Sequence, residues 1–263
     1  MKKVFFMYGA LFLLLLQFTS CLSDKDNNDR IFYFYDEPVV VEKLGAYPFV
    51  RNGFYSFYTP GLTDNTVLKE GDLLWSAFIV DLDDKDYPSV LSTFAYTAKH
   101  FKYDVVESAN VVIPENAEEF QSTLNDDYSD PIESAVLYGY AIDSLWFVGL
   151  KHKVGSNKLH YTYQLVLNPE IEQNSRNNFP TLYIGAKQVN DPDVNQAKDE
   201  NRRNVFAFNV ADFVNFYRKE ISQTGPVRFN LKYKTGVDSN GKDIYRAFLS
   251  NPISWNFNSA KPK

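Results

Sequence analysis

Three histidines are the side chains in this sequence best suited to acid–base chemistry near neutral pH: His100, His152 and His160. A histidine base activates a nucleophile only when the two groups meet, and many serine hydrolases place the serine in a G-x-S-x-G turn. The sequence contains no such turn, and none of the histidines adjoins another nucleophile motif. We therefore expect each histidine to have a structural role, and we assign no catalytic residue.

Clusters of acidic residues offer a second kind of chemistry, because two carboxyl groups can serve a glycosidase as acid and as base or nucleophile. The candidates lie in runs of polar residues, where solvated loops are common. They are Asp81, Asp83, Asp84, Asp86, Glu118, Glu119, Asp126 and Asp127. We expect these residues to lie in loops rather than to form a catalytic pair.

Metal and cofactor motifs are missing from the sequence. It has no CxxC or His-rich zinc spacing, and no glycine-rich phosphate loop follows a predicted strand. Asp24, Asp26 and Asp29 are acidic enough for calcium, but their run lacks the mid-loop glycine and distal glutamate of a calcium loop. We expect neither a bound metal nor a cofactor.

The single cysteine, Cys21, follows a segment that has the features of a secretory signal peptide. Lys2 and Lys3 precede an apolar run from Val4 to Leu16, and small residues follow before Cys21. As a helix this run would span roughly 20 Å, which is short of the ~30 Å hydrocarbon core of a bilayer. We predict that residues 1–20 are removed, and a lone cysteine leaves no disulfide within the chain.

The run Phe18-Thr19-Ser20-Cys21 resembles the lipobox of bacterial lipoproteins, in which the cysteine thiol is acylated and becomes the first mature residue. Acyl chains contribute ~0.8 kcal/mol per buried CH₂, so two or three of them anchor a protein without a spanning helix. The alternative is an ordinary signal peptide with a chance cysteine. The resemblance implies lipidation at Cys21.

Residues 21–30 are predicted to be a lipidated flexible tether, since they are polar and acidic with nothing to bury after Leu22. Their acidic cluster resembles the signal that sends some Gram-negative lipoproteins to the outer leaflet. We expect a lipid-anchored protein of the outer membrane, on its periplasmic or cell-surface face.

The charge balance argues against nucleic acid as a partner. The chain has 27 basic and 33 acidic residues, a formal net charge of −6, and loss of Lys2 and Lys3 makes this −8. A polyanion would be repelled unless the basic residues formed a separate face, and here they alternate with acidic ones. An anionic membrane surface is disfavoured on the same ground.

Residues 31–113 are predicted to form a small β-barrel. Short runs of aromatic and β-branched residues follow one another there, among them Phe101–Val106 and Val111–Ile113. Asn52-Gly53 between two apolar runs predicts a hairpin. The strand from Leu73 to Val80 is apolar on both faces, which indicates a central position. Closure into a barrel would remove exposed edges.

Residues 114–132 are predicted to contain a short helix, from Pro114 to Leu124, and a linker. The remainder, residues 133–260, is predicted to be an antiparallel β-sandwich of about seven strands. A second short helix is expected over Ala211–Ile221, where apolar residues recur at three- and four-residue spacing. Ile253, Trp255 and Phe257 predict a final strand.

Two alternating runs, Trp146–Val154 and Leu159–Leu167, are predicted to pair as a simple hairpin with Val154 opposite Leu159. That register would put His152 opposite Tyr161 on the apolar face and His160 on the other face, so the two histidines could not share a metal ion. Trp146 alternates with aliphatic residues and is expected in the core, and the same expectation applies to Trp75.

The order of these segments resembles the NigD-like lipoproteins. Beyond the lipobox, the resemblance lies in Lys69–Asp72 entering the strand of Trp75, in the Leu145–Leu167 segment, and in Val205–Val210 running into a helix before Phe229–Asp243. It implies an all-β protein with an OB-like N-terminal barrel, a C-terminal β-sandwich and a lipid anchor. The family has no established molecular activity, so the resemblance implies no reaction.

Three functions are compatible with this sequence. The first is a non-catalytic interaction module that docks a protein partner in the cell envelope. The second is a glycan-binding accessory lipoprotein, because 18 Tyr and 3 Trp offer aromatic faces for sugars. The third is a hydrolase of unrecognised type. Several tyrosines are candidates for exposure, or for burial with the hydroxyl at the rim: Tyr33, Tyr35, Tyr47, Tyr55, Tyr58 and Tyr87.

Overall fold

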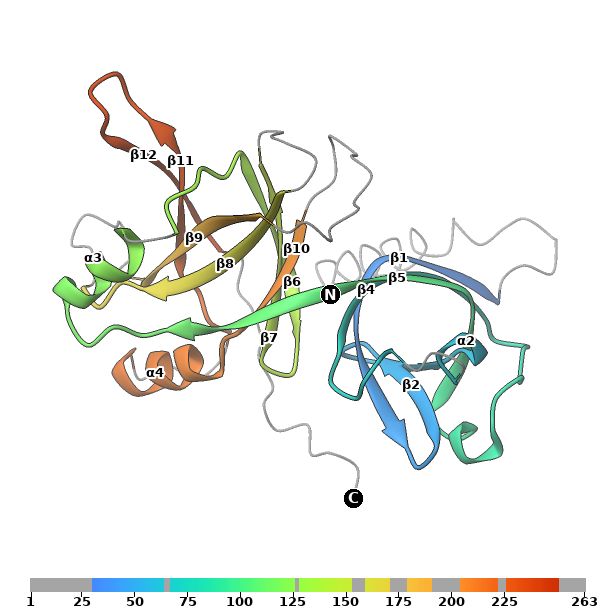
Figure 1. Cartoon of the computed structure of the whole chain (residues 1–263). Helices are drawn as coiled ribbons and strands as arrows, with labels where there is room; N and C mark the ends of the chain where they lie inside the picture. Colours follow the sequence, from blue (N-terminus) through green and yellow to red (C-terminus); the bar gives the residue numbers. More distant parts are fainter. Residues whose placement is uncertain are drawn as a thin grey trace, which may run out of the picture.

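The structure is a computed structural model that describes residues 30–63, 67–125, 128–152, 159–170, 179–190, 204–221 and 226–250. The signal peptide, Cys21, the tether, Val154 and the predicted strand from Ile253 to Phe257 lie outside these residues. The protein is mostly β, and it consists of a five-stranded barrel with further strands attached (Figure 1). The predicted all-β class, with a small barrel and two short helices, is confirmed. The predicted domain bounds stay predictions.

The elements fall into two groups along the chain. The first group holds β1 (Ile31–Leu44), β2 (Tyr47–Arg51), β3 (Ser56–Tyr58), α2 (Pro60–Thr63), β4 (Leu73–Asp81), the 3-10 helix η1 (Ser89–Leu91) and β5 (Ala95–Val112). The second holds α3 (Ala117–Asn125), β6 (Ser134–Ile142), β7 (Leu145–Lys151), β8 (Leu159–Leu167), β9 (Thr181–Asn190), β10 (Asn204–Asn209), α4 (Ala211–Ile221), β11 (Asn230–Val237) and β12 (Asp243–Leu249).

The barrel closes in the order β1-β2-β3-β5-β4, with β4 returning to β1. The β3–β5 pair is parallel and the other four pairs are antiparallel, an OB-like arrangement. β4 lies between β1 and β5, as its two apolar faces predicted. Its inward residues include Leu74, Phe78 and Val80, which are buried with Val39 and Phe57 in the barrel core.

The predicted turn at Asn52-Gly53 is confirmed as the β2–β3 hairpin. The side-chain oxygen Oδ1 of Asn52 accepts hydrogen bonds from the backbone N–H groups of Phe54 and Tyr55, at 2.8 and 2.7 Å. An asparagine that bonds to the backbone two and three residues ahead is a typical turn device. These hydrogen bonds fix the backbone of the turn and so position Phe54 and Tyr55 at the surface of the barrel.

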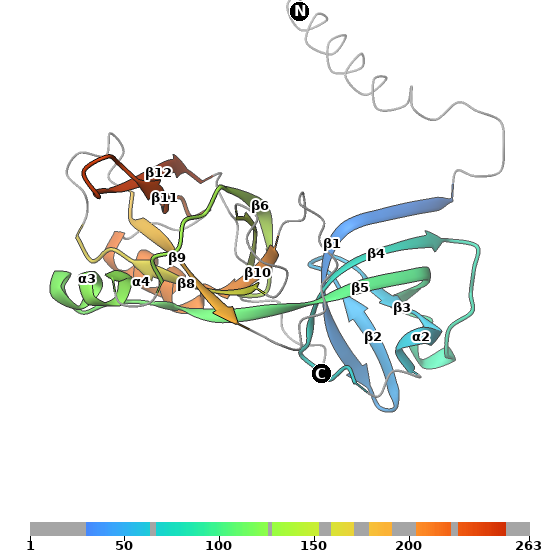
Figure 2. The same cartoon turned by 45° about the horizontal axis from the view of Figure 1, so that its top comes forward.

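Strand β5 belongs to both halves of the molecule (Figure 2). It pairs with β3 and β4 up to Val106, with β10 from Glu107 to Asn110, and with β8 at Val111 and Val112. The sequence suggested two separate strands here, and that prediction is wrong. The polar residues between the two apolar runs lie partly exposed within one continuous strand, so they interrupt the apolar pattern but not the pairing.

The second half contains two sheets that enclose the larger core. One sheet has the order β6-β7-β10-β5 and the other β5-β8-β9-β11-β12. The β5–β10, β5–β8 and β9–β11 pairs are parallel, so this sandwich is mixed rather than antiparallel throughout. Helix α4 has the predicted bounds, and its Phe213, Val214 and Tyr217 pack in the core between the sheets.

The predicted hairpin between the Trp146 and Leu159 strands is wrong. β7 pairs with β6 and β10, whereas β8 pairs with β9 and β5. The true local partner of β7 is β6, and Asp143 adopts a φ of 52° in the turn between them. β7 is buried on both faces, so pairing with strands distant in sequence covers it better than one hairpin would.

The two faces of β7 join the two halves of the protein. Trp146 is fully buried in the sandwich core, as predicted, and its Nε1 donates to the carbonyl oxygen of Tyr138 at 3.1 Å. Phe147 points the other way and packs with Val40, Leu73 and Val106 of the barrel strands. The barrel and the sandwich therefore share an apolar interface.

Polar groups border this interface. The guanidinium of Arg51 in β2 donates to Glu42 at 2.8 Å and to Asp143 of the β6–β7 turn at 2.7 Å.

The predicted burial of Trp75 in the core is wrong, because Trp75 is only half-buried, at the junction of the barrel and the sandwich. Its ring lies 4.8 Å from that of Tyr138, and its Nε1 donates to Asp36 at 3.1 Å.

Replacement of Phe147 by alanine should remove the largest fully buried side chain between the barrel and the sandwich. Because a buried Phe→Ala change leaves a cavity, we expect a loss of about 3–5 kcal/mol in the free energy of unfolding. Urea unfolding followed by circular dichroism measures this loss. Phe54→Ala, the same change at an exposed position, should stay within ~0.5 kcal/mol. Equal losses in the two variants would contradict the interface.

Candidate functional site

Three of the acidic residues considered for glycosidase chemistry, Asp81, Asp83 and Asp84, lie near basic side chains at the surface. Asp84 lies 2.6 Å from the Nζ atom of Lys99, which also lies 3.9 Å from Asp81. The hydrogen bond from Lys99 holds the pKa of Asp84 below its ordinary value. Asp83 pairs with Arg30 at 2.6 Å. The lowered pKa of Asp84 favours its ionised form, which suits an ion pair better than proton donation.

Glu119 has a capping role at helix α3. Asn116 accepts a hydrogen bond from the backbone N–H of Glu119 at 2.9 Å, and the Glu119 carboxylate accepts from the N–H of Glu115 at 2.7 Å. The bond to Asn116 satisfies a donor that the first helical turn leaves open, and the bond from Glu115 ties the residue before the cap to the helix. Asp126 and Asp127 lie outside the described residues. Among the residues described, no three His, Cys, Asp or Glu side chains are grouped to hold a metal ion.

His152 is held in the second half by hydrogen bonds to both ring nitrogens. Its Nδ1 lies 2.9 Å from the carbonyl oxygen of Pro131, which can only accept, so Nδ1 carries the proton. Its Nε2 lies 3.0 Å from the hydroxyl of Tyr163, which can then donate to it. The same hydroxyl accepts from the amide of Asn204 at 3.3 Å. Both ring nitrogens are occupied, so this histidine serves packing.

The environment keeps His152 neutral. Burial lowers its pKa, and the carbonyl of Pro131 and the charge of Asp130 oppose that effect only in part. Burial likewise raises the pKa of Tyr163. The His152 ring stacks on Tyr161 with centroids 3.7 Å apart. The expected proximity of these two residues is correct, but it joins strands of different sheets rather than two arms of a hairpin.

The other two histidines lie on other strands. His100 is exposed in β5, where a φ of 53° marks a bulge opposite Phe78. His160 lies in β8 opposite Val189 of β9, and its side chain lies outside what the structure describes.

A set of aromatic rings that runs from the barrel core to its surface is the most distinctive feature of the described residues. We call it the aromatic row; its members are Phe54, Tyr55, Phe57, Phe78, Tyr96, Phe101 and Tyr103. Consecutive rings lie in contact: Phe54–Tyr55 at 6.5 Å, Tyr55–Tyr96 at 6.0 Å, Tyr55–Phe57 at 6.4 Å, Phe57–Phe78 at 4.7 Å, Phe78–Phe101 at 5.7 Å and Phe101–Tyr103 at 5.8 Å.

Three local features position this aromatic row. The Asn52 turn delivers Phe54 and Tyr55. The parallel β3–β5 pairing sets Phe57 beside Tyr96. The bulge at His100 inserts one extra residue into β5, which keeps Phe101 on the same side as Phe78 rather than on the opposite face.

The row exposes apolar and aromatic surface at its outer members. The exposed fractions are 79% for Phe54, 53% for Tyr55, 40% for Tyr96 and 37% for Tyr103, whereas Phe57 and Phe78 are buried. The buried members hold the exposed ones in place, so little side-chain entropy remains to be lost on binding. Such fixed aromatic groups are typical anchors of protein interfaces.

Ring orientation bears on which ligand this surface suits. Neighbouring planes are inclined by 49° in Phe54–Tyr55, 72° in Tyr55–Tyr96 and 38° in Phe101–Tyr103. Inclined rings form ridges and hollows instead of one flat platform. A surface of that shape fits interdigitating side chains better than the flat face of a sugar ring.

The sequence identified only part of this set. Tyr33, Tyr35, Tyr47 and Tyr55 are exposed, whereas Tyr58 is buried and Tyr87 is half-buried. Phe54, Tyr96 and Tyr103 were missed. The two-residue alternation of Phe101 and Tyr103 could have indicated a shared face, but the bulge that aligns them with Phe78 has no signal in the sequence.

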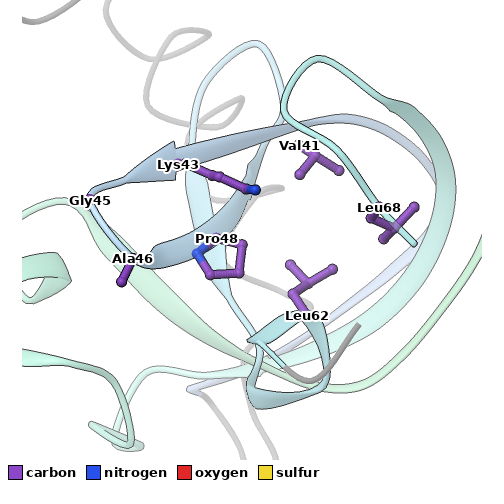
Figure 3. Close-up of a pocket in the computed structure, with 7 residues that line it drawn as sticks. All are labelled: Val41, Lys43, Gly45, Ala46, Pro48, Leu62 and Leu68. Atoms are coloured by element: carbon purple, nitrogen blue, oxygen red, sulfur yellow. The ribbon is translucent and has the colours of Figure 1, made fainter. Parts of the chain in front are cut away.

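A small cavity lies at one end of the barrel near α2 (Figure 3). Its volume is about 160 Å³, and Val41, Lys43, Pro48, Leu62 and Leu68 line it. Ligand pockets commonly measure about 300–1,000 Å³, so this one is too small for most metabolites. Lys43 is its one titratable group among the lining residues, which offers no acid–base pair.

Comparison with known proteins gives a fold and no activity. No protein-family model and no curated protein matches the chain. An uncharacterised protein from Parabacteroides merdae ATCC 43184 has a similar crystal structure, with a TM-score of 0.61 and 12% identity over 87% of this chain and 100% of that chain.

Two further crystal structures come from Bacteroides species. A protein of Bacteroides fragilis NCTC 9343 that is assigned as a lipoprotein shares 13% identity over 88% of this chain and 99% of that one, with a TM-score of 0.53. A DUF1344 protein of unknown function from Bacteroides vulgatus ATCC 8482 shares 13% identity over 85% and 92%, with a TM-score of 0.46. At these identities the likeness concerns the fold. Within the described residues, no helix is long and apolar enough to span a bilayer.

The neutral state of His152 predicts a pH dependence of stability. In the unfolded chain the ring should take up a proton as the pH falls through about 6.5, whereas the folded protein resists this until a lower pH. The unfolded state then binds more protons, so the free energy of unfolding should fall as the pH drops from 7.5 toward 5.5.

Urea unfolding of the wild type and of His152→Gln across this range measures the effect. The variant should show a shallower dependence on pH, and His100→Gln at an exposed position should keep the wild-type slope. An unchanged slope in His152→Gln would show that His152 is not held neutral.

Proposed function

We propose that this protein is a lipid-anchored, non-catalytic interaction module of the bacterial cell envelope, of the NigD-like kind. In this proposal Cys21 carries the acyl chains, residues 22–30 are the tether, and the aromatic row of the barrel is the surface that docks a protein partner. The observation that carries the proposal is the exposure of Phe54, Tyr55 and Tyr96, whose rings contact one another at the surface of the barrel.

The anchor is supported by the lipobox-like run ending at Cys21 and by the similar fold of a Bacteroides protein assigned as a lipoprotein. A location at the outer membrane fits the acidic residues that follow Cys21. The anchor confines the protein to the cell envelope. Two proteins held at one membrane have a raised effective concentration for each other, which favours their binding.

A protein partner is favoured over a glycan by the inclination of the exposed rings. Interface energy commonly concentrates in a few Tyr, Trp and Arg side chains surrounded by less important contacts. Tyr55 and Tyr96 contact each other edge to face and are each about half exposed, which suits them to that role. The glycan-binding alternative would use these same rings. The double variant of Tyr55 and Tyr96 described below therefore tests the protein-binding and the glycan-binding proposals.

Replacement of Cys21 by serine should remove the anchor. The wild type should incorporate an alkyne analogue of palmitate and fractionate with the outer membrane, whereas Cys21→Ser should incorporate none and leave the membrane pellet. A membrane-bound Cys21→Ser variant, or a wild type without label, would contradict lipidation.

Simultaneous replacement of Tyr55 and Tyr96 by alanine should weaken partner binding about 30-fold or more, the loss typical of an interface hot spot. The anchored full-length protein is cross-linked in its native membrane, recovered, and compared with the double variant by quantitative mass spectrometry. Tyr47→Ala is the control, because Tyr47 is similarly exposed and lies outside the aromatic row.

A partner whose recovery drops in the double variant and not in Tyr47→Ala would support the proposal. A partner captured equally by all three proteins would contradict it. Retention of the wild type on a glycan array, lost in the double variant, would replace it with the glycan-binding alternative.

A further inference from the structure

A second exposed aromatic surface lies at the start of β1, apart from the aromatic row in sequence. Tyr33 and Tyr35 are 60% and 72% exposed, and their rings stack with centroids 6.3 Å apart and planes inclined by 7°. Tyr33 lies opposite Ile79 of β4, which in turn lies opposite Lys99 of β5. Directly opposed residues project from the same face of a sheet, so these groups form one outer surface.

This surface follows the tether almost at once. Nine residues, numbers 22–30, separate Cys21 from Ile31, where β1 begins. At ~3.3–3.6 Å per residue the tether spans about 30 Å when fully extended. Its average span as a flexible chain is shorter, about 15–20 Å. Tyr33 and Tyr35 are therefore held close to whatever surface carries the acyl chains of Cys21.

The rest of the molecule leaves this surface accessible. Figure 2 shows the N-terminal part of β1 at the side of the barrel away from the sandwich. The basic groups beside it are neutralised by acidic partners, Arg30 by Asp83 and Lys99 by Asp84, both at 2.6 Å. Two of the carboxylates near the tyrosines are thus neutralised, which lessens the repulsion that a protein of mature formal charge −8 would meet at an anionic lipid surface.

We propose that Tyr33 and Tyr35 rest on the head-group region of the membrane that holds Cys21, and so orient the barrel on the lipid. Tyrosine is suited to this position because its ring enters the apolar boundary while its hydroxyl stays hydrated. The stacked pair is ordered before contact, which lowers the entropic cost of docking. This inference rests on the lipid anchor proposed above and adds a fixed orientation to it.

Because Cys21 would be acylated, a cysteine introduced elsewhere is the only free thiol and can carry a spin label. The label is placed at Ile31→Cys, which lies on the same face of β1 as the two tyrosines, in the lipidated full-length protein. The protein is reconstituted in vesicles of phosphatidylethanolamine with a minor share of phosphatidylglycerol. Collision rates with molecular oxygen, which enters lipid, and with a water-soluble nickel chelate measure the depth of the label. Val237→Cys in β11, also an exposed position, is the control.

The ratio of oxygen to nickel collisions at position 31 should exceed that at position 237 several-fold. It should fall to the control value when Tyr33 and Tyr35 are both replaced by serine, while the protein stays with the vesicles. Equal ratios at positions 31 and 237 in vesicle-bound protein would overturn the membrane contact and leave the anchor standing. A label shielded from both reagents would overturn it in favour of a protein contact. Protein that does not remain with the vesicles would contradict the anchor itself.

Discussion

The 18-residue strand β5 joins the barrel to the second half by continuous main-chain pairing. One end closes the barrel against β3 and β4, and the other end is an edge shared by the two sheets of the sandwich. Since neighbouring residues of one strand cannot move far apart, the two halves are coupled through it. Beside this strand, Phe147 of β7 packs against Val40 and Val106 and so adds an apolar contact between the halves. The ion pairs of Arg51 with Glu42 and Asp143 lie at the border of that contact.

The same strand presents the candidate binding surface. Tyr96, Phe101 and Tyr103 all belong to β5, and its bulge at His100 brings them to one side. The exposed rings continue inward to Phe57 and Phe78 in the barrel core. The candidate surface is thus an extension of the core, which explains why it is both apolar and held in place. Of the side chains considered for catalysis, Asp84 forms an ion pair, Glu119 caps a helix and His152 has hydrogen-bond partners at both ring nitrogens.

Much of the fold could be predicted from the sequence because its signals are local. The apolar spacing of Ala211–Ile221 identifies α4, Asn52-Gly53 identifies the β2–β3 hairpin, and the two-sided apolar pattern of β4 indicates its central position. The failures concern partners distant in sequence. β7 and β8 look like a hairpin because they are adjacent and alternate alike, yet β7 is buried on both faces and pairs with β10 instead.

The candidate site was only partly predictable for the same reason. Tyr55 is exposed, whereas Tyr58, three residues later, is buried. The difference arises because η1 and β5 cover the side of β3 on which Tyr58 lies, and this covering exists only in the folded barrel. The parallel β3–β5 pair and the bulge at His100 decide the geometry of the row, and neither has a sequence signature. The pairing of Asp84 with Lys99 likewise joins a loop to a strand whose register is set by that bulge.

Photo-cross-linking in living cells tests the central claim, that the aromatic row is the docking surface of an anchored protein. A benzophenone amino acid placed at position 96 should, after irradiation, form an adduct of defined mass with one envelope protein, and the same group at position 245 on β12 should form none. An absence of adducts at position 96, or the same adduct from both positions, would contradict the account.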